Sequence, residues 1–285
     1  MRDRNRRASS AVLLCMAVAL MQLASGCGVG RSTTAPRGQD TLAKIQREGV
    51  LHVGYVVYPP TVIKDPNSGD LSGHFVDAVR FLADVMEVRV EFHEATFATF
   101  VAGLQNGQYD VSIAATYRTI PRAMSVAFTK PIIYIGNGAI VRRGESRFSA
   151  LQDFDAPGIV LAVAQGEASH EYAREHFNKA SIRALETADL SLPLSEVLSG
   201  RADVGLADAW TTSQFAKTHP EATDLFTGRP YDLTAVGWAA RPDDMRWLNF
   251  LDTAIDYLES TGRMDQWEAR YGAHWVKPVV EFMPH

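Results

Sequence analysis

Apolar residues recur along the chain in two alternating patterns, which predict strands and helices in turn. Residues 50–55 (VLHVGY) form a short apolar run typical of a strand, and residues 75–86 carry apolar side chains at helical spacing. Residues 88–92 then alternate as a strand does, and residues 159–163 begin a further block with another strand. Strands that alternate with helices predict an α/β fold with a mostly parallel sheet, with ligands expected at the carboxyl ends of the strands.

A helix and a buried strand follow one another within residues 97–115. Apolar residues recur at helical spacing over 97–104, and Gly107 then ends the helix, where a left-handed cap residue is expected. Residues 111–115 (VSIAA) are apolar enough to form a strand that is covered on both faces.

A charged turn comes after this strand. Pro121 suits the first position of a new helix, and Arg122 would lie in its first turn. A cation there opposes the helix dipole and costs ~0.3 to 1 kcal/mol at a surface position. The turn is therefore suited to holding an anion, although a solvated surface arginine would produce the same pattern.

The helix and strand of residues 103–117 (GLQNGQYDVSIAATY) are repeated by residues 196–210 (EVLSGRADVGLADAW) at an offset of 93. The matched pairs are Gly107 with Gly200, Asp110 with Asp203, Val111 with Val204, Ile113 with Leu206 and Ala114 with Ala207. Chance supplies some matches in any helix–strand unit, so the repeat suggests two lobes of similar build. In this register Asp208 follows the strand of the second lobe, and Trp210 corresponds to Tyr117.

The N-terminal residues have the build of an export signal. A basic start (MRDRNRR) precedes the apolar run 11–23, which is too short to span a bilayer. The following LASGC resembles a bacterial lipoprotein cleavage and lipidation motif, with Ala24 where a larger aliphatic residue is usual. We expect a lipoprotein signal peptide over residues 1–26, an acyl anchor on Cys27 and a flexible tether over residues 27–40, which are rich in Gly, Ser, Thr and Pro.

The composition and net charge of the chain limit the classes of partner and of cross-link that can be expected. The apolar content of 46% is enough for a sizeable core. The two cysteines are Cys15 in the leader and Cys27, so no disulfide is expected; a structural free thiol at Cys27 is the alternative to the anchor. Residues 1–26 carry four Arg and one Asp, so their removal would take the formal charge from -5 to -8. An acidic chain without a basic stretch makes nucleic acid an unexpected partner.

No cofactor and no metal site are expected. The eight histidines are scattered, and His170 with His176 lack metal-ligand spacing. The chain also has no nucleophile elbow, phosphate loop or zinc motif that would indicate another class of enzyme.

Over about residues 41–275 the chain resembles the bacterial solute-binding protein family 3, the extracytoplasmic receptors of ABC transporters for amino acids and related solutes. The resemblance rests on six motifs in the family's order: LHVGYVVYPP, GHFVDAV, FVAGLQNGQYDVSIAATYRTIPRAMSVAFTKP, AVAQGEASHEYA, RADVGLADA and LDTAIDYLESTGRMDQWEARYG. It implies an α/β, two-lobed periplasmic binding protein fold (type II). Each lobe is then a mostly parallel sheet flanked by helices, and the lobes close over the ligand about a two-strand hinge.

The resemblance also implies where the lobes begin and end. Lobe 1 would comprise residues 41–139 and lobe 2 residues 140–236, and residues 237–285 would return to lobe 1 and form the C-terminal helices. The chain would cross between the lobes near residues 139–142 and 235–238.

Site residues follow from the same resemblance. Arg122 matches the family arginine that binds the ligand α-carboxylate, and Asp208 matches the acid of lobe 2 that binds the α-amine, so the pair suits a zwitterion. The further matches are an aromatic that stacks on the ligand, an aromatic pocket wall, and a helix start whose backbone and hydroxyl meet the carboxylate: Phe97, Tyr58, Ala168 and Ser169.

Four residues depart from the family pattern. Tyr117 stands where many members have a small Ser or Thr, Phe75 replaces an acid, and Thr61 replaces an aromatic. Glu167 stands where a small hydroxyl residue is common, and it would repel a ligand carboxylate unless it points away or the ligand carries an extra cation. Tyr117 and Trp210 would narrow the cleft or form a face for an aromatic or quaternary-amine ligand, unless both are lobe packing.

The resulting expectation is a monomeric, extracytoplasmic, lipid-anchored binding protein that delivers a small amino acid or related solute to an ABC permease in the cytoplasmic membrane. The first alternative is an enzyme on the same fold, because a cyclohexadienyl dehydratase resembles this family and uses cleft carboxylates as acid catalysts. Here Asp208 or Glu167 would have to serve, with a raised pKa. A ligand-sensing lipoprotein without a permease is the other alternative.

Overall fold

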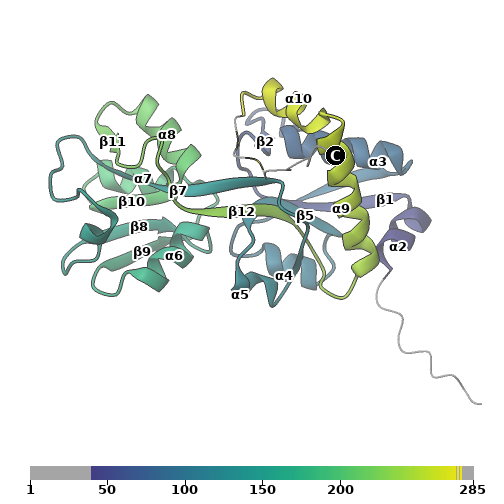
Figure 1. Ribbon diagram of the computed structural model, residues 1–285, viewed down its shortest axis with the longest axis horizontal. Coiled ribbons are helices and arrows are strands. Elements are labelled where there is room, and N and C mark those ends of the chain that lie inside the picture. The colour runs from purple at the N-terminus through teal and green to yellow at the C-terminus, as the bar shows by residue number, and fades with distance from the viewer. Residues whose placement is uncertain (1–39, 274, 276, 278–285) are drawn as a thin grey trace, which may run out of the picture. The chain divides into compact units, whose positions relative to one another are not determined.

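The computed structural model describes residues 40–273, 275 and 277 (Figure 1). The expected signal peptide 1–26, the lipidation residue Cys27 and the tether up to residue 39 lie outside the described residues. Within the described part, one ten-stranded sheet has the order β4-β1-β5-β12-β7-β10-β8-β9, with β6 paired to β12 and β11 paired to β7. A separate pair, β2-β3, forms the hairpin near residue 67.

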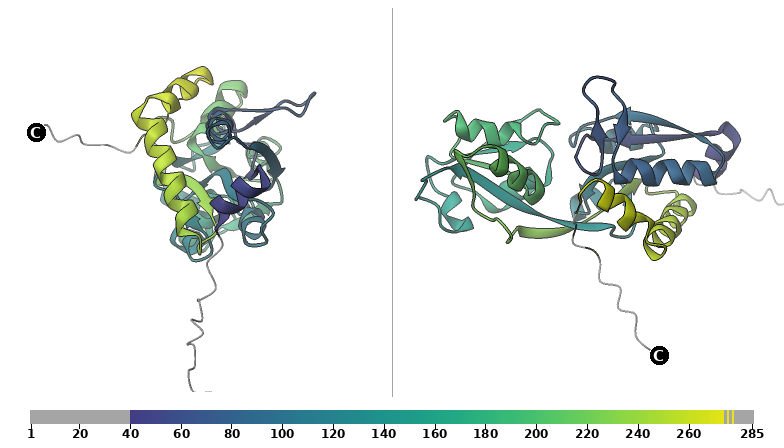
Figure 2. Two further views of the ribbon diagram at one scale, coloured as in Figure 1. Left: turned by 90° about the vertical axis from the view of Figure 1, so that its right-hand side faces the viewer. Right: turned by 90° about the horizontal axis from the view of Figure 1, so that it is seen from above.

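The first lobe is built from the N-terminal elements together with the C-terminal helices. Its elements are α2 (Thr41–Glu48), β1 (Val50–Tyr55), β2 (Ile63–Lys64), β3 (Leu71–Ser72), α3 (His74–Val85), β4 (Arg89–Glu94), α4 (Phe100–Gln105), β5 (Val111–Tyr117), α5 (Ile120–Ala123), β6 (Ala127–Phe128), α9 (Met245–Ser260) and α10 (Arg263–Arg270). Strand β1 pairs in parallel with both β4 and β5. Helix α9 contacts α2 and α10 contacts α3, so the yellow C-terminal helices lie against the first lobe (Figure 2).

The second lobe has the same kind of parallel sheet. Its elements are a 3-10 turn η1 (Leu151–Phe154), β8 (Val160–Ala164), α6 (Ala168–His176), β9 (Ser181–Leu185), α7 (Leu192–Leu198), β10 (Val204–Asp208), α8 (Ala209–Thr218) and β11 (Ala222–Asp224). Strand β8 pairs in parallel with β9 and with β10. Phe154, Leu161 and Leu206 are fully buried in its core, whereas Phe75, Ile113 and Trp238 are fully buried in the core of the first lobe.

Two long antiparallel strands connect the lobes: β7 (Ile133–Arg142) and β12 (Tyr231–Ala240). From Ile133 to Asn137, β7 pairs with β12, and from Asn137 to Ile140 it pairs with β10 of the second lobe. Asn137 is fully buried and belongs to both pairings. Strand β7 therefore changes its pairing from β12 to β10 at Asn137. The expected crossing of the chain between the lobes begins at residue 139, two residues later.

The two sequence repeats share a helix ending. Gly107 and Gly200 have φ values of 69° and 76°, the left-handed region that favours glycine. In both repeats the N–H of the next residue, Gln108 or Arg201, donates a 2.9 Å hydrogen bond back to a carbonyl in the last turn of the helix. This pattern is a Schellman motif, so the expected left-handed cap at Gly107 is confirmed and recurs in lobe 2.

The two repeats also share the joint between the helix and its strand. Asp110 donates its N–H to the carbonyl of His52 at 2.8 Å, and its carboxylate accepts the N–H of His52 at 3.2 Å. Asp203 does the same with Val160, at 2.9 Å in both directions. Each aspartate thus fastens its strand to the start of the neighbouring parallel strand, which is a structural reason for the Asp-Val pair in both repeats.

In the first repeat and the segment before it, two boundaries differ from the expected ones by two or more residues. The strand expected over residues 111–115 continues to Tyr117, and all seven residues of β5 are buried. The helix expected from Phe97 begins only at Phe100, because Thr99 closes a turn on Thr96 first, with its hydroxyl accepting the Thr96 N–H at 3.0 Å. Phe97 is therefore outside the helix and free to contribute to a cavity wall.

Candidate functional site

A cavity lies where the ends of β5 and β10 face one another, and side chains of both lobes line it. Its volume is about 10 Å³, room for about one water molecule. Of the eight residues expected to bind ligand, six line this cavity: Tyr58, Phe97, Tyr117, Arg122, Ala168 and Asp208. The structure therefore brings most of the expected site together, with its side chains packed closely.

Asp208 ends β10 and is the N-cap of α8. It is 2% exposed and accepts hydrogen bonds from the Thr211 N–H at 2.9 Å, the Thr211 hydroxyl at 2.6 Å and the Tyr58 hydroxyl at 2.6 Å. Burial raises the pKa of Asp208, and the bonds from Thr211 and Tyr58 oppose that rise. Because Tyr58 belongs to lobe 1, its bond to Asp208 joins the lobes.

Arg122 makes the second connection between the lobes. It lies in α5, as expected, and is 7% exposed. Its guanidinium donates to the carbonyl oxygens of Tyr117 at 3.3 Å and of Gly166 at 2.7 Å, and pairs with Glu171 at 2.9 Å. Gly166 and Glu171 belong to lobe 2. The cation expected to meet a ligand carboxylate is thus held by oxygen atoms of the opposite lobe.

Glu167 is a second acid in the cavity wall. It is 4% exposed, and burial raises its pKa to about 7 despite the hydrogen bonds from Ser169. The charge of Asp208 raises this pKa further, and that of Arg122 lowers it. Glu167 is one of the residues that line the cavity together with Asp208, and its carboxylate is held at the start of its own helix α6, where it accepts the Ser169 N–H at 2.7 Å.

Ser169 does not have the position expected for it. Its hydroxyl is expected to face the ligand, but Ser169 lies behind Glu167, which is the N-cap of α6 because its carboxylate accepts the Ser169 N–H at 2.7 Å. The Ser169 hydroxyl is fully buried, bonds Glu167 and lies 3.3 Å from the carbonyl of Leu206. It therefore orients Glu167 and does not line the cavity.

Tyr117 and Trp210 correspond in the repeat but not in space. Tyr117 is 4% exposed, lines the cavity and donates to the Gly136 carbonyl at 3.3 Å, close to the connecting strands. Trp210 is the second residue of α8 and lines an open groove of about 690 Å³ beside Tyr58. Its ring lies 5.5 Å from that of Trp275. Trp210 is thus outside the enclosed cavity.

The other two departures from the family pattern are buried in lobe 1 and do not line the cavity. Phe75 is fully buried in the core of lobe 1 and packs edge-on against Trp238 with ring centroids 5.8 Å apart. Thr61 is also fully buried, and its hydroxyl donates to the backbone carbonyl of Tyr58 at 2.6 Å. Thr61 therefore helps to hold the loop that carries Tyr58.

Sequence reasoning missed several residues of the site. Leu190, Ile135 and Ala115 line the cavity, and Glu171 contacts Arg122. Glu171 lies in the first turn of α6, four residues after the N-cap Glu167, so the sequence places both acids near the start of this helix. Ala115 has a φ of 49°, strained for a residue with a side chain, and nothing in its sequence context indicates that conformation.

The structure describes no helix long and apolar enough to cross a membrane.

Residues 51–274 match the family described as bacterial extracellular solute-binding proteins, family 3. Among curated proteins, the glutamate/aspartate import solute-binding protein of Escherichia coli is 24% identical over 92% of this chain and 89% of its own. The cyclohexadienyl dehydratase of Pseudomonas aeruginosa is 23% identical over 80% of this chain and 86% of its own.

Solved structures have the same fold. An ancestral amino-acid-binding protein, described as a precursor of cyclohexadienyl dehydratase, superposes with a TM-score of 0.73 at 27% identity, covering 82% of this chain and 99% of that one. An arginine-binding protein variant from T. maritima gives a TM-score of 0.73 at 23% identity, over 81% and 98% of the two chains. The expected fold, a type II periplasmic binding protein, is confirmed.

Proposed function

The chain belongs to the bacterial extracellular solute-binding proteins, family 3, and from this premise we propose that it is the substrate-binding component of an ABC importer for an amino acid or amino-acid-like zwitterion. Relatives that import or bind amino acids support the solute class. The permease partner and the monomeric state are parts of the proposal.

One observation carries this proposal: Arg122 of lobe 1 and Asp208 of lobe 2 line the same enclosed cavity. A cation and an anion on opposite walls match the two charges of a zwitterion. Both side chains are nearly free of solvent, so a ligand charge placed against either would gain a strong charge-assisted bond.

The lining also favours a ligand with an additional positive charge. Two carboxyl groups, Glu167 and Asp208, stand in the wall, while the single guanidinium of Arg122 is already paired with Glu171. Tyr58, Tyr117 and Phe97 add ring surfaces suited to a cation. We therefore place a cationic amino acid ahead of an acidic one.

Ligand entry requires the lobes to part. A cavity of about 10 Å³ has room for about one water molecule. The contacts that join the lobes across it are Tyr58 with Asp208, and Arg122 with Gly166 and Glu171. A ligand amine would share Asp208 with Tyr58, and a ligand carboxylate would take the place of Glu171 at Arg122. Movement about β7 and β12 is the route we propose for this exchange.

The placement outside the cytoplasm and the lipid anchor at Cys27 complete the proposal. The anchor rests on the LASGC motif. Expressed with its leader, the chain is expected to fractionate with membranes, and Cys27→Ser is expected to release it. A Cys27→Ser protein that stays in the membrane fraction would exclude the acyl anchor and would leave the ligand site untouched.

Calorimetry and thermal shift against amino acids, polyamines and opines test the function. Arginine or lysine is expected to bind with one-to-one stoichiometry and to be recovered unchanged after long incubation. Asp208→Asn is expected to weaken binding, with the exposed Asp243→Asn as the matched control. Absence of binding by every zwitterion tested would contradict the proposal.

A second candidate is an acid-catalysed dehydratase, favoured by Glu167. A carboxyl group with a pKa of about 7 inside a closed cavity is protonated often enough at neutral pH to act as a general acid. The relationship to a cyclohexadienyl dehydratase supports the same chemistry. Incubation with prephenate and arogenate distinguishes the candidates: turnover that is lost in Glu167→Gln would favour the enzyme, and unchanged substrate would favour the binder.

A further inference from the structure

Three metal-ligating side chains meet on one face of the first lobe's sheet, away from the ligand cavity. His52 lies on β1, and Glu91 and His93 lie two residues apart on the neighbouring strand β4, with His52 paired to Glu91 in the parallel register. On β4 these residues alternate with Val90 and Phe92, which pack against the core of lobe 1. Glu91 and His93 therefore project from the opposite face, where His52 also lies.

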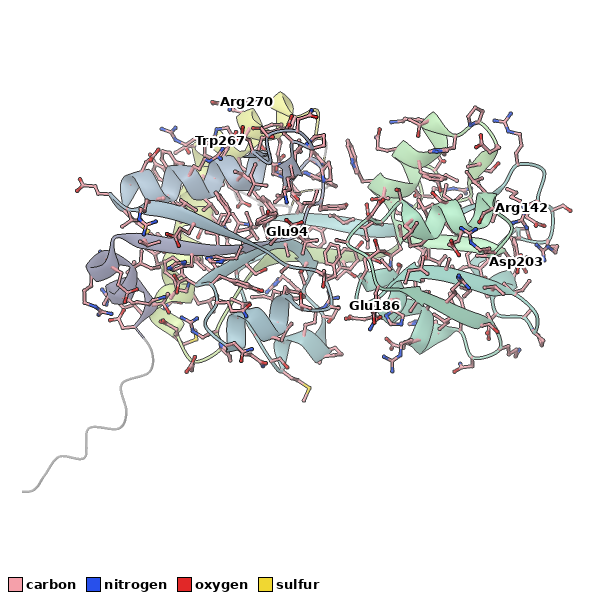
Figure 3. The ribbon with its side chains drawn as sticks, turned by 180° about the vertical axis from the view of Figure 1, so that it is seen from behind. Glu94, Arg142, Glu186, Asp203, Trp267 and Arg270 are labelled. Atoms are coloured by element: carbon pink, nitrogen blue, oxygen red, sulfur yellow. The ribbon has the colours of Figure 1, made fainter. Side chains whose placement is uncertain are left out.

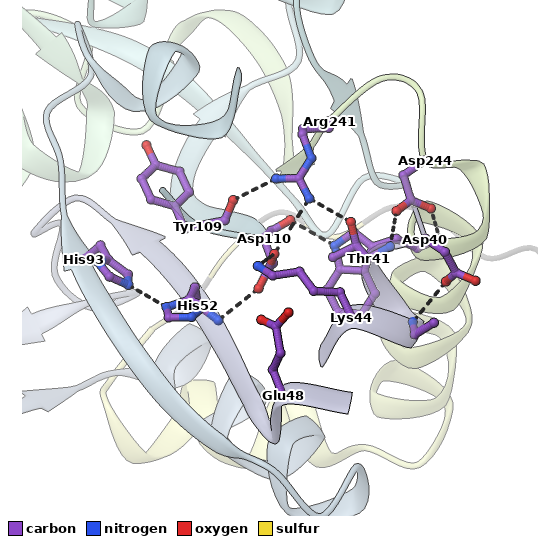
Figure 4. A network of polar contacts seen from close by, with 12 residues as sticks. Asp40, Thr41, Lys44, Glu48, His52, His93, Tyr109, Asp110, Arg241 and Asp244 are labelled. Carbon is purple, nitrogen blue, oxygen red and sulfur yellow. Dashed lines mark hydrogen bonds and ion pairs between the residues drawn. The ribbon is translucent and has the colours of Figure 1, made fainter. Parts of the chain in front are cut away.

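The ligand atoms have the spacing of a coordination shell. His52 Nδ1 is 3.0 Å from His93 Nε2 and 3.4 Å from Glu91 Oε2, and all three residues offer an atom within 4.8 Å of the others. The two imidazoles point toward one another in Figure 4. Zinc bonds to nitrogen and oxygen are about 2.0 to 2.2 Å, which places neighbouring ligand atoms roughly 3.3 Å apart in a tetrahedron. Two of the three separations, 3.0 Å and 3.4 Å, already have about this size.

The surrounding charges leave the ligand atoms available. Arg89 contacts Oε1 of Glu91, whereas Oε2 is the oxygen that faces His52. Lys44 is paired with Asp110 at 3.0 Å, and Lys64 is paired with Glu94. Side chains that are 26% exposed at His52 and 39% exposed at Glu91 leave a path for an ion and its water.

We propose that His52, Glu91 and His93 form a three-ligand site for a divalent transition metal ion of the zinc class, with a water molecule in the fourth position. Two imidazoles and one carboxylate are donors suited to zinc, and three protein ligands leave one position open. β4 is the edge strand of the sheet, so a bound ion would tie this edge to β1 and stabilise lobe 1. None of the three residues lines the ligand cavity.

The test uses the full chain without a histidine tag, stripped of metal with a chelator. Zinc chloride is titrated by calorimetry, and cobalt(II) is titrated by absorption, because tetrahedral cobalt has intense visible bands. We expect one equivalent of either ion and a higher melting temperature with zinc. His93→Ala and Glu91→Gln are each expected to lower zinc affinity by at least about 10-fold, the lower end of losses seen when residues supporting a metal are changed.

Matched controls separate this site from other histidines and from the ligand cavity. His219→Ala removes a histidine of lobe 2 stacked on Phe215 with ring centroids 3.9 Å apart, and zinc affinity is expected to stay unchanged. Asp208→Asn is likewise expected to leave zinc binding intact, so this proposal can fail or hold independently of the proposed function.

Two results would overturn the metal site. One is zinc stoichiometry and affinity that stay the same in Glu91→Gln and in His93→Ala. The other is a cobalt spectrum with only the weak bands of an octahedral, water-rich complex. Melting curves of the variants in chelator, compared with the parent chain in chelator, show whether each variant folds; if His93→Ala does not, Glu91→Gln at its partly exposed position still decides the question.

Discussion

The two repeated units begin alike and end differently. Both start with a Schellman motif and an aspartate that fastens the strand, but the aspartates have different surroundings. Asp110 is fully buried, with Lys44 at 3.0 Å and Arg241 at 3.7 Å (Figure 4). Asp203 is 19% exposed, with Arg147 at 2.7 Å, and Arg142 lies beside it (Figure 3). The backbone geometry that the two repeats share therefore serves the fold. Residues from the C-terminal part of the chain bury the aspartate only in lobe 1.

The strand ends carry the difference that builds the site. In lobe 1 the strand continues through Ala115, with its positive φ, to the buried Tyr117. In lobe 2 the strand ends at Asp208, which turns the chain into α8 and places Trp210 outside the enclosed cavity. The same helix–strand unit thus ends in a turn that carries Arg122 in lobe 1 and in the buried Asp208 in lobe 2.

Removing the fastening aspartates should give the largest effect and the clearest contrast. Asp110→Ala leaves the buried Arg241 without its carboxylate, and we expect a loss of about 3 to 5 kcal/mol in the free energy of unfolding. Asp203→Ala, at a partly exposed position, should cost about 1 to 2 kcal/mol. Urea denaturation measures both. Equal losses in the free energy of unfolding would mean that the burial of Asp110 by the C-terminal segment does not make it more important than Asp203.

Arg122→Ala should weaken ligand binding by about 2 to 5 kcal/mol, or about 30- to several-thousand-fold. The reason is that a nearly buried guanidinium is the cation offered by the end of lobe 1. Calorimetry with the ligand found in the screen measures the change. Arg174→Ala, exposed on α6, is the matched control. If Arg122→Ala leaves the affinity unchanged, the ligand carboxylate is not bound at the turn after β5.

Tyr58→Phe tests the bond between the lobes with a smaller change. The hydroxyl donates to the buried Asp208 at 2.6 Å, and a closed form without that bond should bind ligand about 10-fold more weakly. Tyr257→Phe, at a half-exposed position, should leave the affinity as it is. Tighter binding by Tyr58→Phe would instead mean that Tyr58 competes with the ligand amine for Asp208.

Glu167 should give the protein a pH dependence that Glu167→Gln removes. Burial raises its pKa from 4.5 to about 7 in the folded state. The folded chain therefore holds this proton more tightly than the unfolded chain, so its contribution is complete below pH 4.5 and is lost as the pH rises toward 7 and above. The slope is at most about 1.4 kcal/mol per pH unit. Denaturation of parent and variant from pH 4.5 to 8 measures it, and parallel curves would place Glu167 in a more polar setting.

Signals from neighbouring residues are enough to predict most helices and strands, and to predict a charged turn after β5. The sequence predicts a helix end at Gly107 because the backbone after a helix often needs a left-handed residue, and glycine takes that conformation without strain. Proline at the first helical position likewise predicts the helix that contains Pro121 and Arg122. The sequence does not predict that Glu167, two residues before Ser169, caps α6, because Ser, Thr, Asp and Asn are the usual N-cap residues; only the structure shows the Glu167 carboxylate accepting the Ser169 N–H.

By itself the sequence determined the α/β order of the elements, the repeated aspartate and the family. These follow from the spacing of apolar residues, the positions of glycines and the order of motifs, which can all be read along the chain. Only the tertiary structure decided which residues meet. Glu167 became a cavity acid, and His52 came within 3.0 Å of His93, because strand pairing and lobe contact join positions far apart in the chain. The energies of such pairs depend on burial and on distance, and neither can be read from spacing along the chain.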